Sequence, residues 1–174
     1  MNNKLKKVLI VTTNFSGNTN SPIKETGVYL EEFASPYLVF KDTGYDITVA
    51  SPLGGLSPVD EGSMSCSNPE EWDQCIKILR HTTRLSEVDY KSYDALFLPG
   101  GDGPMFDLAN DEFLKIVVEY FYDNDKLLSA VCHGPAGFVL ARTKEGESIV
   151  KNKKVTCFTN KEESIAEKIV EFLS

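Results

Sequence analysis

Cys132 and His133 are neighbouring residues whose types and position could carry out covalent chemistry. They follow the apolar run Lys126 to Val131 and precede Gly134, which opens a new segment. A buried strand, then a nucleophile, then a glycine that begins a helix is the sequence form of a nucleophile elbow. Such a turn exposes one side chain at the carboxyl edge of a parallel sheet. We therefore predict Cys132 as a nucleophile and His133 as its base.

The reactivity of Cys132 depends on how much of it is thiolate. A thiol with a pKa of about 8.5 is only a few per cent ionised at neutral pH, whereas one with a pKa of about 5.5 is almost wholly ionised. The positive end of the following helix, with hydrogen bonds to the sulfur, can supply this difference of about 4 kcal/mol. We expect a lowered thiol pKa at Cys132; the alternative is an inert, buried cysteine.

A base of this kind needs a carboxylate to orient it. Glu163 lies just beyond a predicted strand at 154–158 and is the candidate to orient His133. Glu162 is the competing candidate, because spacing alone does not separate the two.

An oxyanion needs hydrogen-bond donors. Gly100 and Gly101 follow a predicted strand at 93–99 and offer unhindered amide groups. Such a pair after a strand is also often only a turn, but the carboxyl ends of parallel strands lie at one edge of the sheet. Gly100, Gly101 and Gly134 are therefore predicted to contact a bound carbonyl substrate or its oxyanion.

The elements that must position these residues alternate between apolar runs and amphipathic segments. Near-continuous apolar strands followed by helices predict an α/β fold with a mainly parallel sheet between two layers of helices. We find no repeat or linker, so residues 1–174 are expected to form one domain. The predicted strands are 7–13, 45–50, 93–99, 126–131 and 154–158; the predicted helices are 27–42 with a possible kink at Pro36, 68–81 with Asn68 as cap, 104–124, 134–141 and 161–173.

The composition excludes several classes of function. A formal net charge of -8 over 174 residues, without a cluster of Lys and Arg, argues against nucleic-acid binding. Every apolar run is shorter than the roughly 18 residues of a membrane span, and no leader precedes Lys4, so we expect a cytoplasmic protein. The four cysteines are expected to be reduced. Zinc binding by Cys66, Cys75 and His81 is disfavoured because there is no C-x-x-C pair.

Five motifs in the same order resemble the ThiJ/PfpI superfamily, which has the class I glutamine amidotransferase-like fold. They are most similar to its branch of heat-shock chaperones and cofactor-independent glyoxalase III proteins. This resemblance implies a flavodoxin-like three-layer sandwich. The motifs are Glu25 to Glu32, Ala50 to Gly55, Leu98 to Gly101, Ala130 to Pro135 and Phe158 to Asn160.

The resemblance also implies a set of roles. A carboxylic acid from the first long helix hydrogen-bonds the sulfur, and the Gly-Val-aromatic-x-x-Glu pattern places it at Glu32 rather than Glu31, which projects about 100° away. Burial would raise the pKa of Glu32 and let it shuttle protons. The same matching places the triad acid at Glu163. The implied activity is conversion of methylglyoxal to lactate, or a related deglycation, without glutathione, metal or other cofactor. The alternative is a stress-response chaperone or a redox sensor that uses oxidation of Cys132.

Two departures from that branch affect the pocket. Asp102 stands where the branch usually has a histidine, so it is predicted to line the substrate pocket and to alter substrate preference. Relatives also continue beyond the position of Ser174. We expect apolar surface to be left open to a partner, and a homodimer.

Overall fold

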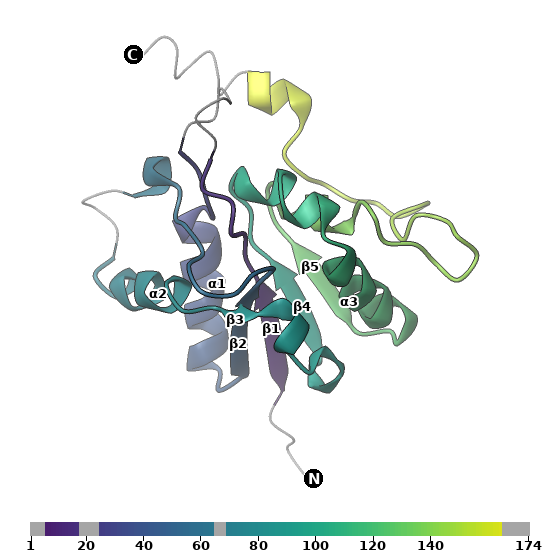
Figure 1. Ribbon diagram of the computed structural model, residues 1–174, viewed down its shortest axis with the longest axis horizontal. Helices are drawn as coiled ribbons and strands as arrows, with labels where there is room; N and C mark the ends of the chain where they lie inside the picture. Colours follow the sequence, from purple (N-terminus) through teal and green to yellow (C-terminus); the bar gives the residue numbers. More distant parts are fainter. Residues whose placement is uncertain (1–5, 18–24, 65–68, 165–174) are drawn as a thin grey trace.

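The computed structural model describes residues 6–17, 25–64 and 69–164. Its centre is a five-stranded sheet in the order β3-β2-β1-β4-β5, and every neighbouring pair is parallel. This arrangement confirms the predicted α/β, flavodoxin-like class (Figure 1). The elements are β1 (Lys7–Val11), α1 (Leu30–Asp42), β2 (Asp46–Ser51), α2 (Trp72–Leu79), β3 (Thr83–Arg84), β4 (Ala95–Leu98), α3 (Glu112–Asp123) and β5 (Leu127–Ala130).

Helices cover both faces of the sheet, with α1 and α2 on one side and α3 on the other (Figure 1). Side chains alternate between the two faces along a strand. In β1, Val8 and Ile10 pack with the cluster under α1 and α2, whereas Leu9 and Val11 pack with the cluster under α3. Because both faces of β1 are buried, its sequence is apolar without alternation.

Three helices begin later than the sequence predicts. The helix α2 spans Trp72–Leu79 with Glu71 at its N-cap position, so it is shorter at both ends than the predicted 68–81. Residues Gly27 to Tyr29 are not helical, and Val28 pairs with Val59 in an isolated bridge. The helix α3 begins at Glu112 because the Asp111 side chain accepts a hydrogen bond from the Leu114 N–H at 2.6 Å, which makes it the N-cap. Residues 103–110 instead contain the short 3-10 segments η4 (Gly103–Met105) and η5 (Leu108–Asn110). Pro36 lies inside α1 without ending it.

Two strand predictions fail at the edges of the sheet. The sequence missed β3, which is only two residues long and pairs with Ala50 and Ser51. The predicted strand at 154–158 is wrong. Residues 152–157 are exposed and form no ladder, and the adjoining Phe158 N–H donates a single hydrogen bond to the Cys132 carbonyl. Among the described residues, β5 therefore has β4 as its one strand neighbour.

The two helices predicted after β5 also differ from those in the structure. The segment after Cys132 is η6 (Gly134–Phe138), a short 3-10 turn rather than an α-helix. The closing helix begins at Asn160 and is described as far as Ser164. Its expected apolar residues from Ile165 onward, and the predicted cap Asn68, lie outside the described residues.

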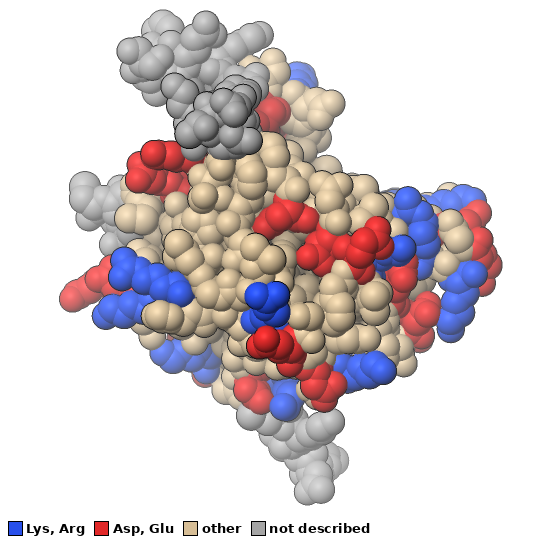
Figure 2. Space-filling view, in the orientation of Figure 1, with Lys and Arg blue, Asp and Glu red and all other residues tan. Residues whose placement is uncertain are grey.

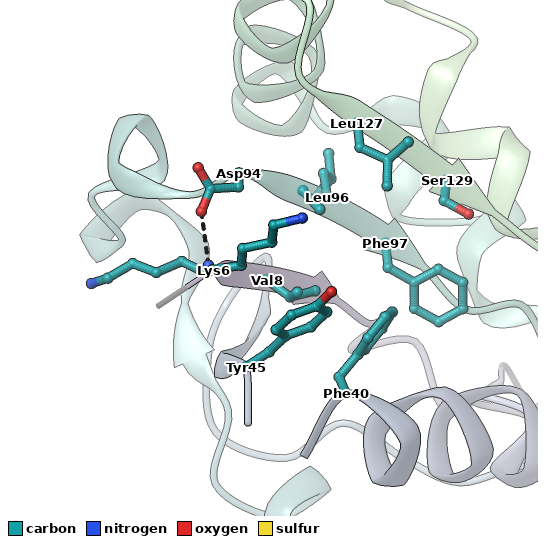
Figure 3. A pocket seen from close by; sticks show the side chains of 11 residues that line it. Lys6, Val8, Phe40, Tyr45, Asp94, Leu96, Phe97, Leu127 and Ser129 are labelled. Carbon is teal, nitrogen blue, oxygen red and sulfur yellow. Dashed lines mark hydrogen bonds between the residues drawn. The ribbon is translucent and has the colours of Figure 1, made fainter. Parts of the chain in front are cut away.

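An apolar groove of about 490 Å³ lies on the α1 side of β4 and β5 (Figure 3). Phe40, Tyr45, Phe97 and Leu127 contribute to its lining, and Leu127 is 65% exposed. On the face shown in Figure 2, basic side chains occur in small groups beside acidic ones. No helix in the described part of the chain is long and apolar enough to cross a membrane.

The chain that follows β4 crosses the segment before α1 at very close range. Gly101 has a φ of +92°, and a Cβ there would lie 2.2 Å from the Gly27 oxygen and 2.6 Å from the Tyr29 nitrogen. The crossing is held by hydrogen bonds from the Tyr29 N–H to the Gly100 oxygen and from the Gly103 N–H to the Gly27 oxygen. Only glycine fits at position 101 without moving backbone.

Gly101→Ala is expected to destabilise the protein much more than Gly146→Ala. Gly146 also has a positive φ, +82°, but nothing lies within 4 Å of a Cβ built there. Alanine at position 146 therefore costs only backbone strain, about 1–2 kcal/mol. At position 101 alanine brings the same strain and also a clash with backbone atoms. We therefore expect its loss of unfolding free energy to exceed that of Gly146→Ala by at least about 2 kcal/mol. Urea unfolding followed by circular dichroism measures both, and equal losses would contradict the close crossing.

Candidate active site

Cys132 occupies a left-handed backbone conformation with a φ of +54°, which is rare for a residue other than glycine. Backbone hydrogen bonds surround it: the Val131 N–H donates to the Leu98 oxygen at 3.1 Å, and the Gly134 N–H donates to the Val131 oxygen at 2.8 Å. A strained turn between a parallel strand and the next segment is the geometry of a nucleophile elbow. The predicted elbow is therefore present.

Gly134 supports the turn by its lack of a side chain. A Cβ at this position would lie 2.2 Å from the Leu98 oxygen. Its N–H is already used within the turn, so Gly134 permits the close packing of the elbow against β4 and does not present that N–H as an oxyanion donor.

Glu32, from the first turn of α1, reaches the sulfur. Its carboxyl group hydrogen-bonds the Cys132 side chain, and its Oε2 accepts from the Gly100 N–H at 2.9 Å. Glu31 is exposed on another side of the helix. The Gly100 amide thus holds the acid in place, whereas the Gly101 and His133 amides hydrogen-bond the sulfur.

Burial and the Glu32 carboxylate raise the pKa of the Cys132 thiol to about 11, and the hydrogen bonds from the Gly101 and His133 amides only partly oppose them. Burial likewise raises the pKa of Glu32. The expected lowering of the thiol pKa is therefore wrong for the state in which Glu32 is ionised. The short 3-10 turn of η6 explains part of the difference, because it lacks the aligned peptides of a longer helix. Two groups coupled in this way titrate as a pair, so a thiolate forms most readily when Glu32 holds the proton.

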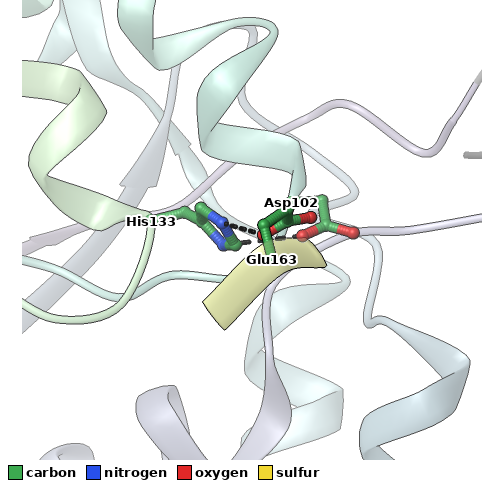
Figure 4. Close-up of side chains that lie close together, drawn as sticks. All are labelled: Asp102, His133 and Glu163. Atoms are coloured by element: carbon green, nitrogen blue, oxygen red, sulfur yellow. Dashed lines mark hydrogen bonds and ion pairs between the residues drawn. The ribbon is translucent and has the colours of Figure 1, made fainter. Parts of the chain in front are cut away.

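His133 connects the sulfur to a second carboxylate. Its Nδ1 lies 3.6 Å from the Cys132 sulfur, and its Nε2 lies 3.1 Å from Oε2 of Glu163 (Figure 4). The His133 ring also packs against Phe158, with centroids 4.8 Å apart. The structure thus brings Cys132, His133, Glu32 and Glu163 together, the arrangement of a nucleophile, a base and an orienting acid.

Glu162 has a different role from Glu163. Its Oε2 accepts hydrogen bonds from the Thr159 N–H at 2.8 Å and the Thr159 hydroxyl at 2.7 Å, and the Glu162 N–H donates back to that hydroxyl. This reciprocal pair is a capping box at the start of the closing helix. The T-x-x-E spacing was visible in the sequence and would have assigned Glu162 to the cap.

Asp102 contacts His133, which the sequence analysis missed. Its Oδ1 lies 3.5 Å from Nδ1 of His133, the nitrogen that also faces the sulfur (Figure 4). Because β4 and β5 are parallel neighbours, residues shortly after their carboxyl ends lie at one edge of the sheet. That signal could have placed Asp102 beside His133. Phe158 was also missed.

Asp102, His133 and Glu163 form a group with the residue types of a metal site, and their ligand atoms lie within 4.8 Å of one another. The two carboxylates, however, face different nitrogens of one ring. An imidazole offers a given ion a single nitrogen, so an ion at either nitrogen would be poorly placed for the far carboxylate. The arrangement is better suited to orienting His133 and moving protons than to holding a metal.

Comparisons of the sequence with known proteins all point to one family. The profile of the DJ-1/PfpI family matches residues 23–173. The chain is 34% identical to Glyoxalase 3 of Candida albicans, over 91% of this chain and 71% of that protein. It is 29% identical to the glutathione-independent glyoxalase HSP31 of Saccharomyces cerevisiae, over 92% of this chain and 71% of that protein.

Comparison with solved structures finds proteins that are similar in both sequence and fold. The crystal structure of glyoxalase III from Candida albicans is 32% identical and superposes with a TM-score of 0.78, over 92% of this chain and 71% of that one. Rapid Encystment Protein 24 KDa from Francisella tularensis is also 32% identical, with a TM-score of 0.82 over 93% of this chain and 74% of that one.

Glu32→Gln is expected to speed alkylation of Cys132 by iodoacetamide at neutral pH. The substitution removes the carboxylate charge that raises the thiol pKa, and each unit by which the pKa falls gives about tenfold more thiolate at a fixed pH below it. Mass spectrometry at several pH values measures the rate at Cys132.

Glu31→Gln removes the same charge from an exposed neighbour and should leave that rate nearly unchanged. A slower rate in Glu32→Gln would contradict the prediction. It would indicate that Glu32 carries the proton in the resting protein and donates it to a thiolate.

Proposed function

Because the chain belongs to the DJ-1/PfpI family, we propose that it is a glutathione-independent glyoxalase that converts methylglyoxal to lactate. The observation that carries this proposal is the hydrogen bond between the Glu32 carboxyl and the Cys132 sulfur at the elbow. That contact pairs a nucleophile with a proton-shuttling acid. Relatives named as glyoxalases support a small carbonyl compound as the substrate.

The first step is attack of the Cys132 thiolate on the aldehyde carbon. A C–S bond forms, the carbonyl electron pair moves to oxygen, and that oxygen takes a proton to give a hemithioacetal. The Gly101 and His133 amides, which hydrogen-bond the sulfur, are backbone donors close to the developing charge.

The second step moves a proton between the two carbons that carried the carbonyl groups. The proton leaves the carbon bonded to sulfur, and another is delivered to the former ketone carbon, which yields a thioester. Glu32 and His133 both contact the sulfur and are placed to carry these protons. Glu163 orients His133. Water then hydrolyses the thioester, which releases lactate and restores the thiol. The net reaction therefore converts one methylglyoxal and one water into one lactic acid.

A redox sensor is the second candidate. The carboxyl group beside the sulfur can also donate a hydrogen bond to an oxidised sulfur, which favours its formation at Cys132. Cys75 is fully buried, and its burial raises the pKa of its thiol to about 11. Peroxide would then oxidise Cys132 first, and the protein would signal stress rather than turn over a carbonyl compound. A chaperone role is the other form of this stress-response candidate, and the open apolar groove supports it.

The sequence-based expectations of one domain over residues 1–174 and of a cytoplasmic location are part of the same proposal. The two apolar clusters on either side of one sheet support the single domain. The free thiols Cys75, Cys132 and Cys157 support a reducing compartment.

Purified protein is expected to form lactate from methylglyoxal without added glutathione, and Cys132→Ala and Glu32→Gln are expected to lower kcat/KM by at least about a hundredfold each. Enzymatic assay of lactate measures this. Cys157→Ser is the matched control, because Cys157 is an exposed thiol outside the elbow and its loss should leave the rate unchanged.

Absence of lactate from protein whose Cys132 still alkylates would refute the glyoxalase proposal. Mass spectrometry of the peptides after peroxide treatment then separates the alternatives. Selective oxidation of Cys132 would favour the redox sensor, and oxidation of Cys157 first would count against it.

We further propose a homodimer that covers the groove along β4 and β5, supported by the 65% exposure of Leu127. Light scattering is expected to give twice the chain mass, and Leu127→Glu to shift the protein toward monomer. Ile116→Glu, an exposed position on α3 at the other face, is the control that should remain dimeric. A monomeric wild-type protein at micromolar concentration would overturn this proposal.

A further inference from the structure

Asp102 places a carboxylate close to the reactive sulfur. Its Oδ1 and the Cys132 sulfur lie 3.5 and 3.6 Å from the same nitrogen of His133, so the two are closer than a Debye length, about 8 Å at physiological ionic strength. The Asp102 side chain is 30% exposed, so it faces solvent as well as the ring. A molecule that approaches the sulfur therefore enters the field of this carboxylate.

The charges around Asp102 reinforce that field. Glu163 and Asp60 both act on Asp102 as negative charges, and His133 is the partner that opposes them. The Glu32 carboxyl group hydrogen-bonds the sulfur itself and adds a further carboxylate to the site. Among the described residues, no ion pair of a Lys or Arg involves Glu32, Asp102 or Glu163. The surroundings of the sulfur are thus rich in carboxylates, with the His133 ring between Asp102 and Glu163.

The three carboxylates are not equivalent toward a substrate. Glu32 is occupied by the sulfur and by the Gly100 amide. Glu163 contacts Nε2, on the far side of the ring from the sulfur. Asp102 contacts Nδ1, the near nitrogen, and is therefore the carboxylate best placed to act on a group bound next to the sulfur.

We propose that Asp102 is a specificity-determining residue that makes the pocket select uncharged 2-oxoaldehydes and reject those that carry a carboxylate. The inference rests on the proposed function, since it names the substrate class of that site. A carboxylate on the substrate would be brought within a Debye length of Asp102, where the two like charges repel each other. Methylglyoxal carries an uncharged methyl group instead and meets no such penalty.

The test compares alkylation of Cys132 by iodoacetamide and by iodoacetate. These reagents are nearly the same size and differ in one negative charge. In both reactions the thiolate forms a C–S bond and iodide leaves. The ratio of the two rates cancels any change in the amount of thiolate, because both reagents react with the same sulfur. Asp102→Asn is expected to lower the iodoacetamide-to-iodoacetate ratio at Cys132 by about tenfold.

Two controls are available in the same protein. Glu31→Gln removes one charge from an exposed position on α1 and should leave the ratio unchanged. The exposed Cys157 gives the ratio of a thiol outside the elbow. Alkylation of the buried Cys75 would report unfolding of a variant, in which case Asp102→Ser replaces Asp102→Asn. An unchanged ratio at Cys132 in a folded Asp102 variant would overturn the inference.

The corresponding activity measurement uses methylglyoxal and 4,5-dioxopentanoate, a 2-oxoaldehyde that carries a carboxylate. Asp102→Asn should raise kcat/KM for the anionic compound relative to methylglyoxal by about tenfold. Failure to turn over methylglyoxal would contradict the proposed function but not the alkylation result. An unchanged alkylation ratio in a protein that makes lactate would contradict only the role of Asp102.

Discussion

The left-handed backbone at Cys132 is the constraint on which the site depends. A residue with a side chain in this conformation costs about 1–2 kcal/mol relative to a relaxed turn. The backbone hydrogen bonds on either side of it and the absence of a side chain at Gly134 make the turn possible. The sharp reversal carries the sulfur toward α1, where it meets the Glu32 carboxyl and the Gly101 amide. A relaxed turn would point the same side chain elsewhere and separate these groups.

Burial gives the Cys132 and Glu32 pair its chemical character. The enclosure that raises the pKa of the thiol also raises that of the acid. The Glu32 carboxylate raises the pKa of the thiol further, whereas the hydrogen bond with Cys132 lowers the pKa of Glu32. Such a pair does not provide a permanently ionised sulfur. It keeps a proton close to the place where a carbonyl oxygen or carbon would need one. This suits a reaction that moves protons within a bound molecule better than one that needs only a strong nucleophile.

Much of this arrangement could be predicted from the sequence. The apolar run of β1 predicted a strand buried on both faces, and the elbow followed from the residues around Cys132. The two-residue β3 could not be predicted, because so short a strand has no periodicity. The expected strand at 154–158 has suitable residues, but a strand also needs a partner along its edge, and here a single hydrogen bond joins Phe158 to the elbow. The contact of Asp102 depends on two strands being neighbours, and the raised pKa of the thiol depends on distances that a sequence does not contain.

The capping box at Thr159 and Glu162 has a consequence for the spacing of the chain. It fixes where the closing helix begins, and Phe158, one residue earlier, is tied to the carbonyl of Cys132. Glu163 is therefore set at one angle around the helix relative to the elbow. Since each helical residue turns the chain by about 100°, a single insertion or deletion between Phe158 and Glu163 would rotate the carboxylate away from His133 while every residue type stayed the same. In this family member, the number of residues in that connection is as much a part of the site as the glutamate itself.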